Sequence, residues 1–321
     1  MKAYIQILII SMSLATLCAA CEDENEIFKK EQYENIVYIV SNTDNIFEAE
    51  YELDGSNNPL SLPVSYGGTQ KIQQNVEVTL KTERELFDYY NKIHFDLEKE
   101  KFAKLLSPAQ YSVPDNTVTL SPDNDYDYGL MPVHIKTEVL DKLSPDSVYF
   151  ISFGIETVSD GYNINPDKSR ALYRIYKKNA YVSTKGTEYY SFKGYRGERY
   201  LTSATKRLFP MTKDKVRMFV GAELFNIKTV TEKEIQQKSV IVQVHSDNSL
   251  TIEPYDAEFM DVELLSPPAD DETFLYTNTY DPETLTFQLY YRYRNYNESN
   301  GTWGDWTVIR ERSMKNKTTE K

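Results

Sequence analysis

The chain has 321 residues, of which 49 are acidic and 36 are basic, and its formal net charge is −13 at pH 7. Proteins that bind nucleic acid neutralise phosphates with Lys and Arg, so this charge argues against a nucleic-acid partner. The two cysteines, Cys18 and Cys21, both lie near the N-terminus, so we expect no disulfide and no catalytic thiol in the rest of the chain.

Residues 1–20 have the pattern of a secretory signal. Lys2 supplies a positive start, residues 3–17 are mostly apolar, and Ala19 and Ala20 precede Cys21. The apolar run is short and interrupted by polar residues, which disfavours the alternative of a transmembrane anchor.

The junction at Cys21 resembles a bacterial lipobox, in which the Cys is acylated and becomes the first residue. The acidic residues that follow resemble the surface-export signal of Bacteroidota lipoproteins. These resemblances imply a protein anchored by lipid, palmitate included, on the exposed face of the cell outer membrane. Cleavage by an ordinary signal peptidase, which would leave Cys21 as a free thiol, is the alternative.

Residues 21–35 are polar and acidic, and they predict a flexible tether between the lipid and a folded body. Residues 36–178 contain about eight short apolar or alternating segments separated by turns, a pattern that is typical of a β-sandwich. Residues 47–53 show it well, because apolar residues alternate with Glu, which places the acids on a solvated face.

A short helical insertion is expected between residues 82 and 106. Thr82 and Glu85 have the spacing of a capping box, and apolar residues follow at helical spacing. A second helical piece is expected over residues 97–106, and Pro108 then prevents its continuation.

Several segments of this first domain resemble one known family. They are YSVPDNTVTL at 111–120, LSPD at 143–146, INPDKS at 164–169 and ALYRIY at 171–176. The family is the N-terminal domain of unknown function of Bacteroidota outer-membrane lipoproteins, which often accompany starch-utilisation-type glycan uptake systems. The resemblance covers residues 36–178 and implies an immunoglobulin-like fold.

The polar stretch 177–187 predicts the domain boundary, and residues 188–321 form the second domain. This domain also contains about nine strand-like segments, together with a helix expected over residues 231–237. A sheet of this many antiparallel strands exposes unpaired backbone groups at its edges unless it closes on itself. We therefore expect a closed or nearly closed antiparallel β-barrel. The second domain, residues 188–321, resembles the C-terminal domain of the same lipoproteins. The whole chain is therefore predicted to be all-β.

The clearest strand spans residues 285–293, where side chains alternate between two faces. One face carries Leu285, Phe287, Leu289, Tyr291 and Tyr293, and the other carries Thr286, Gln288, Tyr290, Arg292 and Arg294.

The sequence holds no recognisable catalytic, metal-binding or cofactor-binding motif. His94, His134 and His245 are far apart, and the glycines do not form a phosphate-binding loop. The turn 123–127 is rich in Asp, but an EF-type calcium loop requires Gly where Tyr128 stands and Glu at position 134. An acidic turn is the prediction, and a calcium site of another kind stays open.

The candidate ligand-binding residues lie near the C-terminus. Aromatic rings stack on the apolar faces of sugars, and Arg side chains hydrogen-bond to sugar hydroxyls. The candidates that combine these two properties are Tyr290, Arg292, Arg294, Tyr296, Trp303 and Trp306.

These features predict a surface lipoprotein that binds a polysaccharide or oligosaccharide for an uptake system and has no catalytic activity. A transporter or neighbouring surface lipoproteins would be its partners. One alternative is an adhesin or structural protein that binds a protein partner. The other is a glycosidase, which needs two carboxylates facing each other across a cleft.

Overall fold

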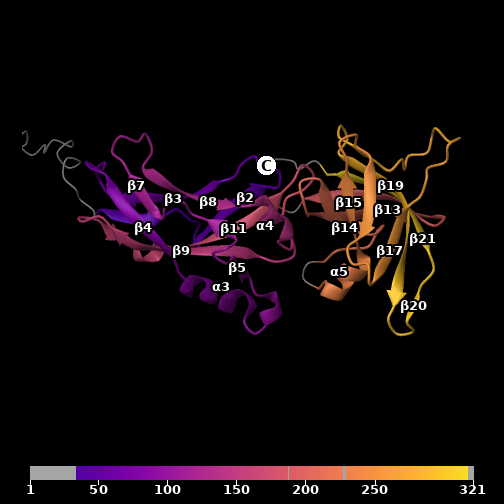
Figure 1. Cartoon of the computed structure of the whole chain (residues 1–321), viewed down its shortest axis with the longest axis horizontal. Helices are drawn as coiled ribbons and strands as arrows, with labels where there is room; N and C mark the ends of the chain where they lie inside the picture. The colour runs from indigo at the N-terminus through magenta and orange to yellow at the C-terminus, as the bar shows by residue number, and fades with distance from the viewer. Residues whose placement is uncertain (1–33, 187, 227–228, 317–321) are drawn as a thin grey trace, which may run out of the picture.

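The computed structural model describes residues 34–186, 188–226 and 229–316, which form two domains placed end to end (Figure 1). The predicted signal, Cys21 and residues 21–33 of the tether lie outside the described residues. Within the described part, no helix is long and apolar enough to cross a membrane.

The N-terminal domain is a sandwich of two sheets. Most neighbouring strands are antiparallel, while β1–β10, β2–β11 and β5–β9 are parallel. The first sheet consists of β10 (Asn163–Ile164), β1 (Ile36–Ile39), β3 (Leu60–Gly67), β8 (Tyr128–Ile135) and β6 (Tyr111–Ser112) in that order. The second consists of β2 (Ile46–Glu52), β11 (Arg170–Lys178), β9 (Tyr149–Val158), β4 (Val76–Thr82) and β7 (Thr117–Leu120), with β5 (Lys104–Leu105) added beside β9.

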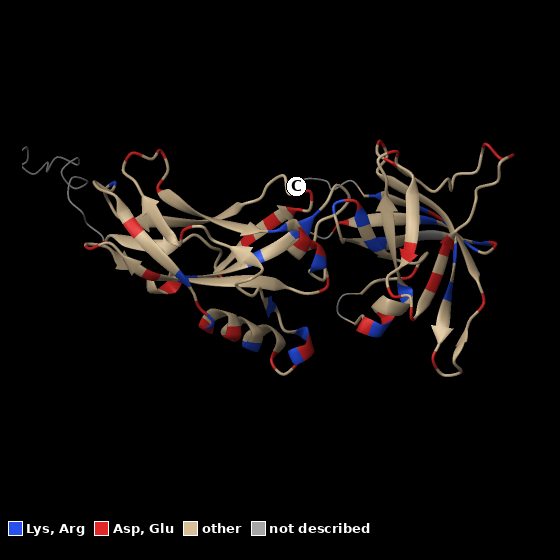
Figure 2. Ribbon diagram, viewed as in Figure 1, with Lys and Arg blue, Asp and Glu red and all other residues tan. Residues whose placement is uncertain are grey.

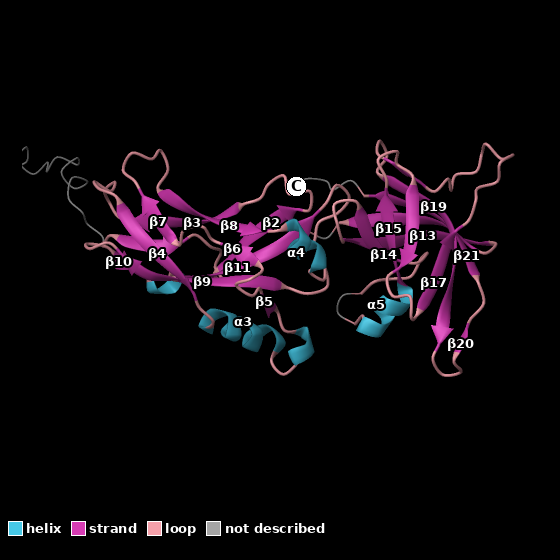
Figure 3. Cartoon of the chain, in the orientation of Figure 1, coloured by secondary structure: helices cyan, strands magenta, loops and turns pink. Residues whose placement is uncertain are grey.

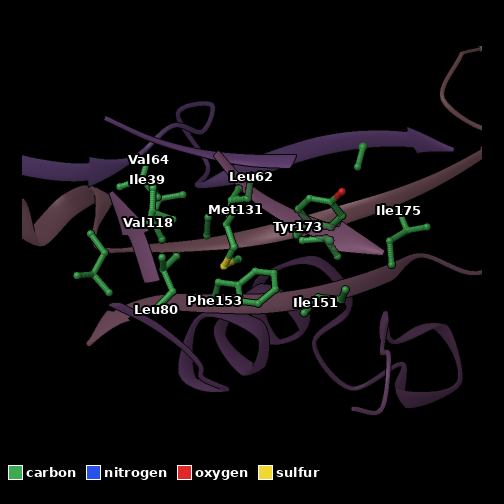
Figure 4. Close-up of a cluster of buried hydrophobic side chains, with 14 of the residues drawn as sticks. Ile39, Leu62, Val64, Leu80, Val118, Met131, Ile151, Phe153, Tyr173 and Ile175 are labelled. Atoms are coloured by element: carbon green, nitrogen blue, oxygen red, sulfur yellow. The ribbon is translucent and has the colours of Figure 1, made fainter. Parts of the chain in front are cut away.

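The core of this domain lies between the two sheets. Leu62 and Met131 of the first sheet face Phe153 and Tyr173 of the second (Figure 4). The Tyr51 hydroxyl is buried here, but it is not left unsatisfied, because it lies 2.8 Å from the Tyr173 hydroxyl and 2.9 Å from the carbonyl oxygen of Val133. The predicted β-sandwich is confirmed.

The helical insertion differs from the prediction in two details. Thr82 does not cap α3, because Arg84 takes the N-cap position without a side-chain hydrogen bond. Residues 97–106 form a helix only in the single 3-10 turn at 99–101, because the backbone amides of Lys104 and Leu106 donate to the carbonyl oxygens of Val148 and Phe150 at the start of β9 and draw the end of this segment into the sheet. Tertiary pairing outweighs local helix propensity here. The helical segments are α3 (Glu85–Phe95), η1 (Lys99–Lys101), α4 (Thr137–Lys142) and η2 (Pro166–Lys168) (Figure 3).

The C-terminal domain is one strongly curved antiparallel sheet. The two strands at the ends of its order, β16 and β17, pack beside each other without ladder hydrogen bonds, which gives the expected barrel-like shape. The order is β16 (Leu250–Pro254), β15 (Ser239–Val244), β14 (Lys215–Phe219), β13 (Arg199–Pro210), β12 (Tyr189–Arg196), β21 (Thr307–Lys315), β19 (Thr286–Asn297) and β17 (Met260–Leu264). The short strands β18 (Thr279–Asp281) and β20 (Thr302–Trp303) pair with β19, and α5 is Glu232–Lys238.

The alternation predicted for the long strand places the barrel core. Phe287, Leu289, Tyr291 and Tyr293 of β19 are buried inside the barrel. Leu285 precedes the strand and is exposed, so the predicted apolar face is one residue shorter than expected.

A buried ion pair joins the two domains. The Arg217 side chain of β14 is fully buried, and its two terminal nitrogens donate to Asp146 of the N-terminal domain at 2.5 and 2.6 Å. Its guanidinium also lies 4.5 Å from the ring centre of Phe209. Nearby, the Asn179 amide donates to the carbonyl oxygens of Thr212 and Lys215. These contacts tie the base of the barrel to the sandwich.

Candidate functional site

A row of Arg and Trp side chains covers the outer face of the barrel near one end. Residues Arg292 and Arg294 point outward from β19 because the alternate residues are in the core. The Arg292 guanidinium lies 4.4 Å from the ring centre of Trp306, and that of Arg294 lies 4.5 Å from it. Arg294 is also 5.3 Å from the Trp303 ring centre.

The β19–β20 hairpin brings Trp303 to this row. Tyr296 and Trp303 are directly opposite each other in the two strands, and their rings meet edge to face at 5.4 Å. We name the group Tyr296, Arg292, Arg294, Trp303 and Trp306 the Arg–Trp ladder. Five of the six predicted ligand-binding residues therefore lie together.

Acidic residues of β17 hold the two guanidinium groups in place. Asp261 is opposite Arg294 in the sheet and accepts hydrogen bonds from it at 2.8 and 3.1 Å. Glu263 is opposite Arg292 and forms an ion pair with it. The arginines are thus oriented before any ligand binds, which lowers the entropy cost of binding.

The two tryptophans are not equivalent. Trp306 lies against both guanidinium groups and is half-buried, so its ring is largely occupied within the protein. Trp303 is 37% exposed and lies at the edge of the ladder. Trp303 therefore offers the ring surface that a ligand could contact.

Tyr290, the sixth predicted residue, belongs to another group. Its ring packs edge to face against Phe274, at 5.2 Å, and not against the tryptophans. It lies two strand positions away from Arg292 along β19, on the same outer face.

A polar cavity of about 330 Å³ opens beside the ladder at the end of the barrel. Within it, Glu223 lies 3.7 Å from Arg196 and 3.5 Å from Lys238. Burial raises the pKa of the Tyr293 hydroxyl above its ordinary value. The lining residues that carry polar groups are Arg196, Glu223, Gln237, Lys238, Tyr293, Arg294, Asn295, Asp305 and Thr307.

The cavity residues were not among the sequence predictions. Arg196, Glu223 and Lys238 come from three separate segments and show no shared spacing that would mark them. Only the closure of the barrel brings them to the same end as the ladder. An exposed indole ring beside many hydrogen-bonding groups is an arrangement suited to a hydroxyl-rich ligand.

A larger hollow of about 650 Å³ lies between α3 and β5 in the N-terminal domain. Neither Trp nor Tyr is among its lining residues, and two of its charged residues, Arg84 and Asp88, pair with each other across one turn of the helix. We therefore place the candidate site at the end of the barrel.

Two family models match the chain. One is described as an N-terminal domain and matches residues 32–161, and the other is described as a C-terminal domain and matches residues 169–312. No curated protein sequence matches the chain.

Solved structures from Bacteroides share the two-domain fold. A protein of unknown function from Bacteroides ovatus aligns over 88% of this chain and 94% of its own, with a TM-score of 0.58 and 15% identity. An auxiliary nutrient binding protein from Bacteroides thetaiotaomicron aligns over 86% of this chain and 92% of its own, with a TM-score of 0.54 and 14% identity. These neighbours agree with the predicted resemblance to a Bacteroidota family.

Proposed function

We propose that this protein is a surface lipoprotein that binds a glycan at the end of its C-terminal barrel and does not cleave it. Trp303 would stack on a sugar ring, and the polar groups of the neighbouring cavity would hydrogen-bond to hydroxyls. Arg292 and Arg294 would hold Trp306 and the β19–β20 hairpin in a fixed position for this contact.

The observation that carries this proposal is the exposed ring of Trp303, whose chain neighbour Gly304 and whose contact Arg294 line the polar cavity. Covering the exposed part of the indole ring with the apolar face of a sugar would remove apolar surface from water, which favours binding. The likeness to an auxiliary nutrient binding protein supports a binding role, although at 14% identity the likeness itself concerns the fold.

Trp303→Ala is expected to weaken glycan binding about ten-fold, or by about 1.4 kcal/mol, because the aromatic contact is lost. Affinity gels containing plant and host polysaccharides would identify a ligand, and calorimetry would then measure the change. The unfolding midpoint should change little, because Trp303 lies at the surface.

Tyr126→Ala is the matched control, because Tyr126 is an exposed aromatic residue of the N-terminal domain. This variant should bind like the wild type. If wild-type protein is retained by none of the polysaccharides, the proposal is wrong. Release of shorter products from the bound glycan would favour a glycosidase instead.

We further propose that Cys21 is acylated and anchors the protein on the outer membrane. Cys21→Ser is expected to abolish incorporation of labelled palmitate and to remove the protein from the membrane fraction. The variant lacks the residue that carries the lipid, and the lipid is the proposed anchor. Cys18→Ser is the control and should leave the protein in that fraction. Equal membrane association of the two variants would contradict the proposal.

A further inference from the structure

A second group of aromatic residues lies on the outer face of the barrel, next to the Arg–Trp ladder. Four residues stand opposite one another across adjacent strands: Tyr200 of β13, Tyr195 of β12, Arg310 of β21 and Tyr290 of β19. The Arg310 guanidinium lies 4.4 Å from the ring centre of Tyr195, and the Tyr195 and Tyr200 rings are 4.8 Å apart.

The loop before β18 adds two more rings to this row. Phe274 packs against Tyr290, and Tyr276 packs against Phe274 at 5.4 Å and against Tyr195 at 6.5 Å. Tyr200 is half exposed, and the other rings are partly exposed. We name Tyr195, Tyr200, Phe274, Tyr276 and Tyr290 the tyrosine face.

Two positive charges stand side by side in the next row of the same outer face. Lys193 of β12 and Arg312 of β21 are direct cross-strand partners. Side chains in such positions have Cβ atoms about 5 Å apart, and like charges placed there destabilise a sheet. Figure 2 shows other Lys and Arg residues on the strands of this domain.

Neither cation is paired directly with an acidic side chain of the described residues, although Asp281 lies within electrostatic range of Arg312. Within the part of the chain that the structure describes, Lys193 and Arg312 take part in no ion pair, and the Nε of Arg312 is buried without a hydrogen-bond partner. By contrast, Arg292, Arg294 and Arg310 on the same face each pair with an acidic residue. Asp281 is close enough to feel the charge of Arg312, but its carboxylate accepts hydrogen bonds from Thr284.

The backbone is irregular at this point. The register between β12 and β13 shifts between Phe192 and Gly194, because Lys193 alone stands opposite two residues of β13, so Lys193 faces a bulge in β13. Bulges are frequent beside binding sites. In a chain with a net charge of −13, two adjacent cations that form no ion pair with an acid among the described residues and lie beside exposed rings are a feature that the fold itself does not require.

We infer that this face binds an acidic polysaccharide, one whose sugars carry carboxylate or sulfate groups. An acidic group of the ligand lies between Lys193 and Arg312 and relieves their repulsion, while neighbouring sugars contact the tyrosine face. This inference rests on the proposed function and names its ligand class. Tyr290 and Tyr296 are six residues apart on β19, roughly 20 Å, so a single extended chain reaches both the tyrosine face and the Arg–Trp ladder.

The test compares matched polysaccharides that differ only in charge. Purified protein is titrated with polygalacturonic acid and its methyl ester, and with heparin and its desulfated form. At least one acidic form should bind about ten-fold tighter than its neutral counterpart at low salt, and the difference should shrink as salt is added. Lys193→Gln/Arg312→Gln should reduce the affinity for the acidic form to that for the neutral form.

The control is Lys99→Gln/Lys142→Gln, which changes the net charge equally at two exposed positions in the N-terminal domain. It should bind the acidic form like the wild type. If neutral and acidic glycans bind equally, or if both double variants behave alike, the inference is wrong and the proposed function stands. If no glycan binds, both are wrong.

Discussion

Glu311→Leu is expected to lower the unfolding free energy of the protein by about 3–5 kcal/mol, because it leaves the ammonium group of Lys206 unpaired inside the barrel. Both side chains are completely buried and form an ion pair. Burial already lowers the pKa of Lys206, and without Glu311 that residue must either lose its proton or carry its charge in an apolar core.

Glu311 also organises the polar groups around it. Its carboxylate accepts hydrogen bonds from Tyr291, at 3.0 Å, and from Ser313, at 2.7 Å. The Tyr291 hydroxyl in turn accepts a hydrogen bond from the backbone amide of Gly221 at 2.8 Å. Loss of the carboxylate therefore leaves two further buried donors without an acceptor.

Denaturant unfolding of a double-mutant cycle would measure this effect. Lys206→Met/Glu311→Leu should recover more than half of the loss, because no unpaired charge is left in the core. Glu298→Leu removes the acid of an exposed ion pair with Lys233 and should change stability little. A similarly small change in Glu311→Leu would show that the buried pair does not hold the barrel together.

Gly194→Ala is expected to lower the free energy of unfolding by about 3 kcal/mol or more. This equals or exceeds the largest loss of stability that an overpacked side chain usually causes. A Cβ atom at Gly194 would lie 1.9 Å from the backbone oxygen of Arg310 and 2.9 Å from its carbonyl carbon. These atoms belong to β21, which is hydrogen-bonded to β12, so relief requires the two strands to separate.

Thermal or denaturant unfolding with Gly186→Ala as the control would test this prediction. No atom lies within 4 Å of the position that a Cβ would take at Gly186, so that variant should match the wild type. Equal stability of the two variants would mean that β12 and β21 separate at little cost. Because β12 and β21 also present Lys193 and Arg312, Gly194→Ala should disturb that pair as well.

Local patterns predicted much of this fold. The two-residue period of a strand identified which side chains of β19 enter the barrel. The helix predicted over residues 231–237 is α5, and the structure adds that Thr231 and Glu234 form both hydrogen bonds of a capping box at its start. Of the helical piece predicted over residues 97–106, only the 3-10 turn at 99–101 forms, because the amides of Lys104 and Leu106 pair with the start of β9, a strand distant in the sequence.

The candidate site was predicted only in part. Five of the predicted residues gather because they lie on one strand and on the segment that folds back beside it. The polar cavity, the tyrosine face and the Lys193–Arg312 pair draw on strands far apart in the sequence. Nothing in the sequence around Lys193 indicates that Arg312 will be its neighbour.

The sequence by itself determined the strand content, the direction of the alternating side chains and the acidic character of the chain, because each depends on adjacent residues or on composition. The tertiary structure alone decided which charges meet. Glu311 forms an ion pair with Lys206 inside the barrel. Arg312, the next residue of β21, lies opposite Lys193, which is another cation. Both outcomes depend on the register of β21 against its neighbours, and register is a property of the closed barrel as a whole.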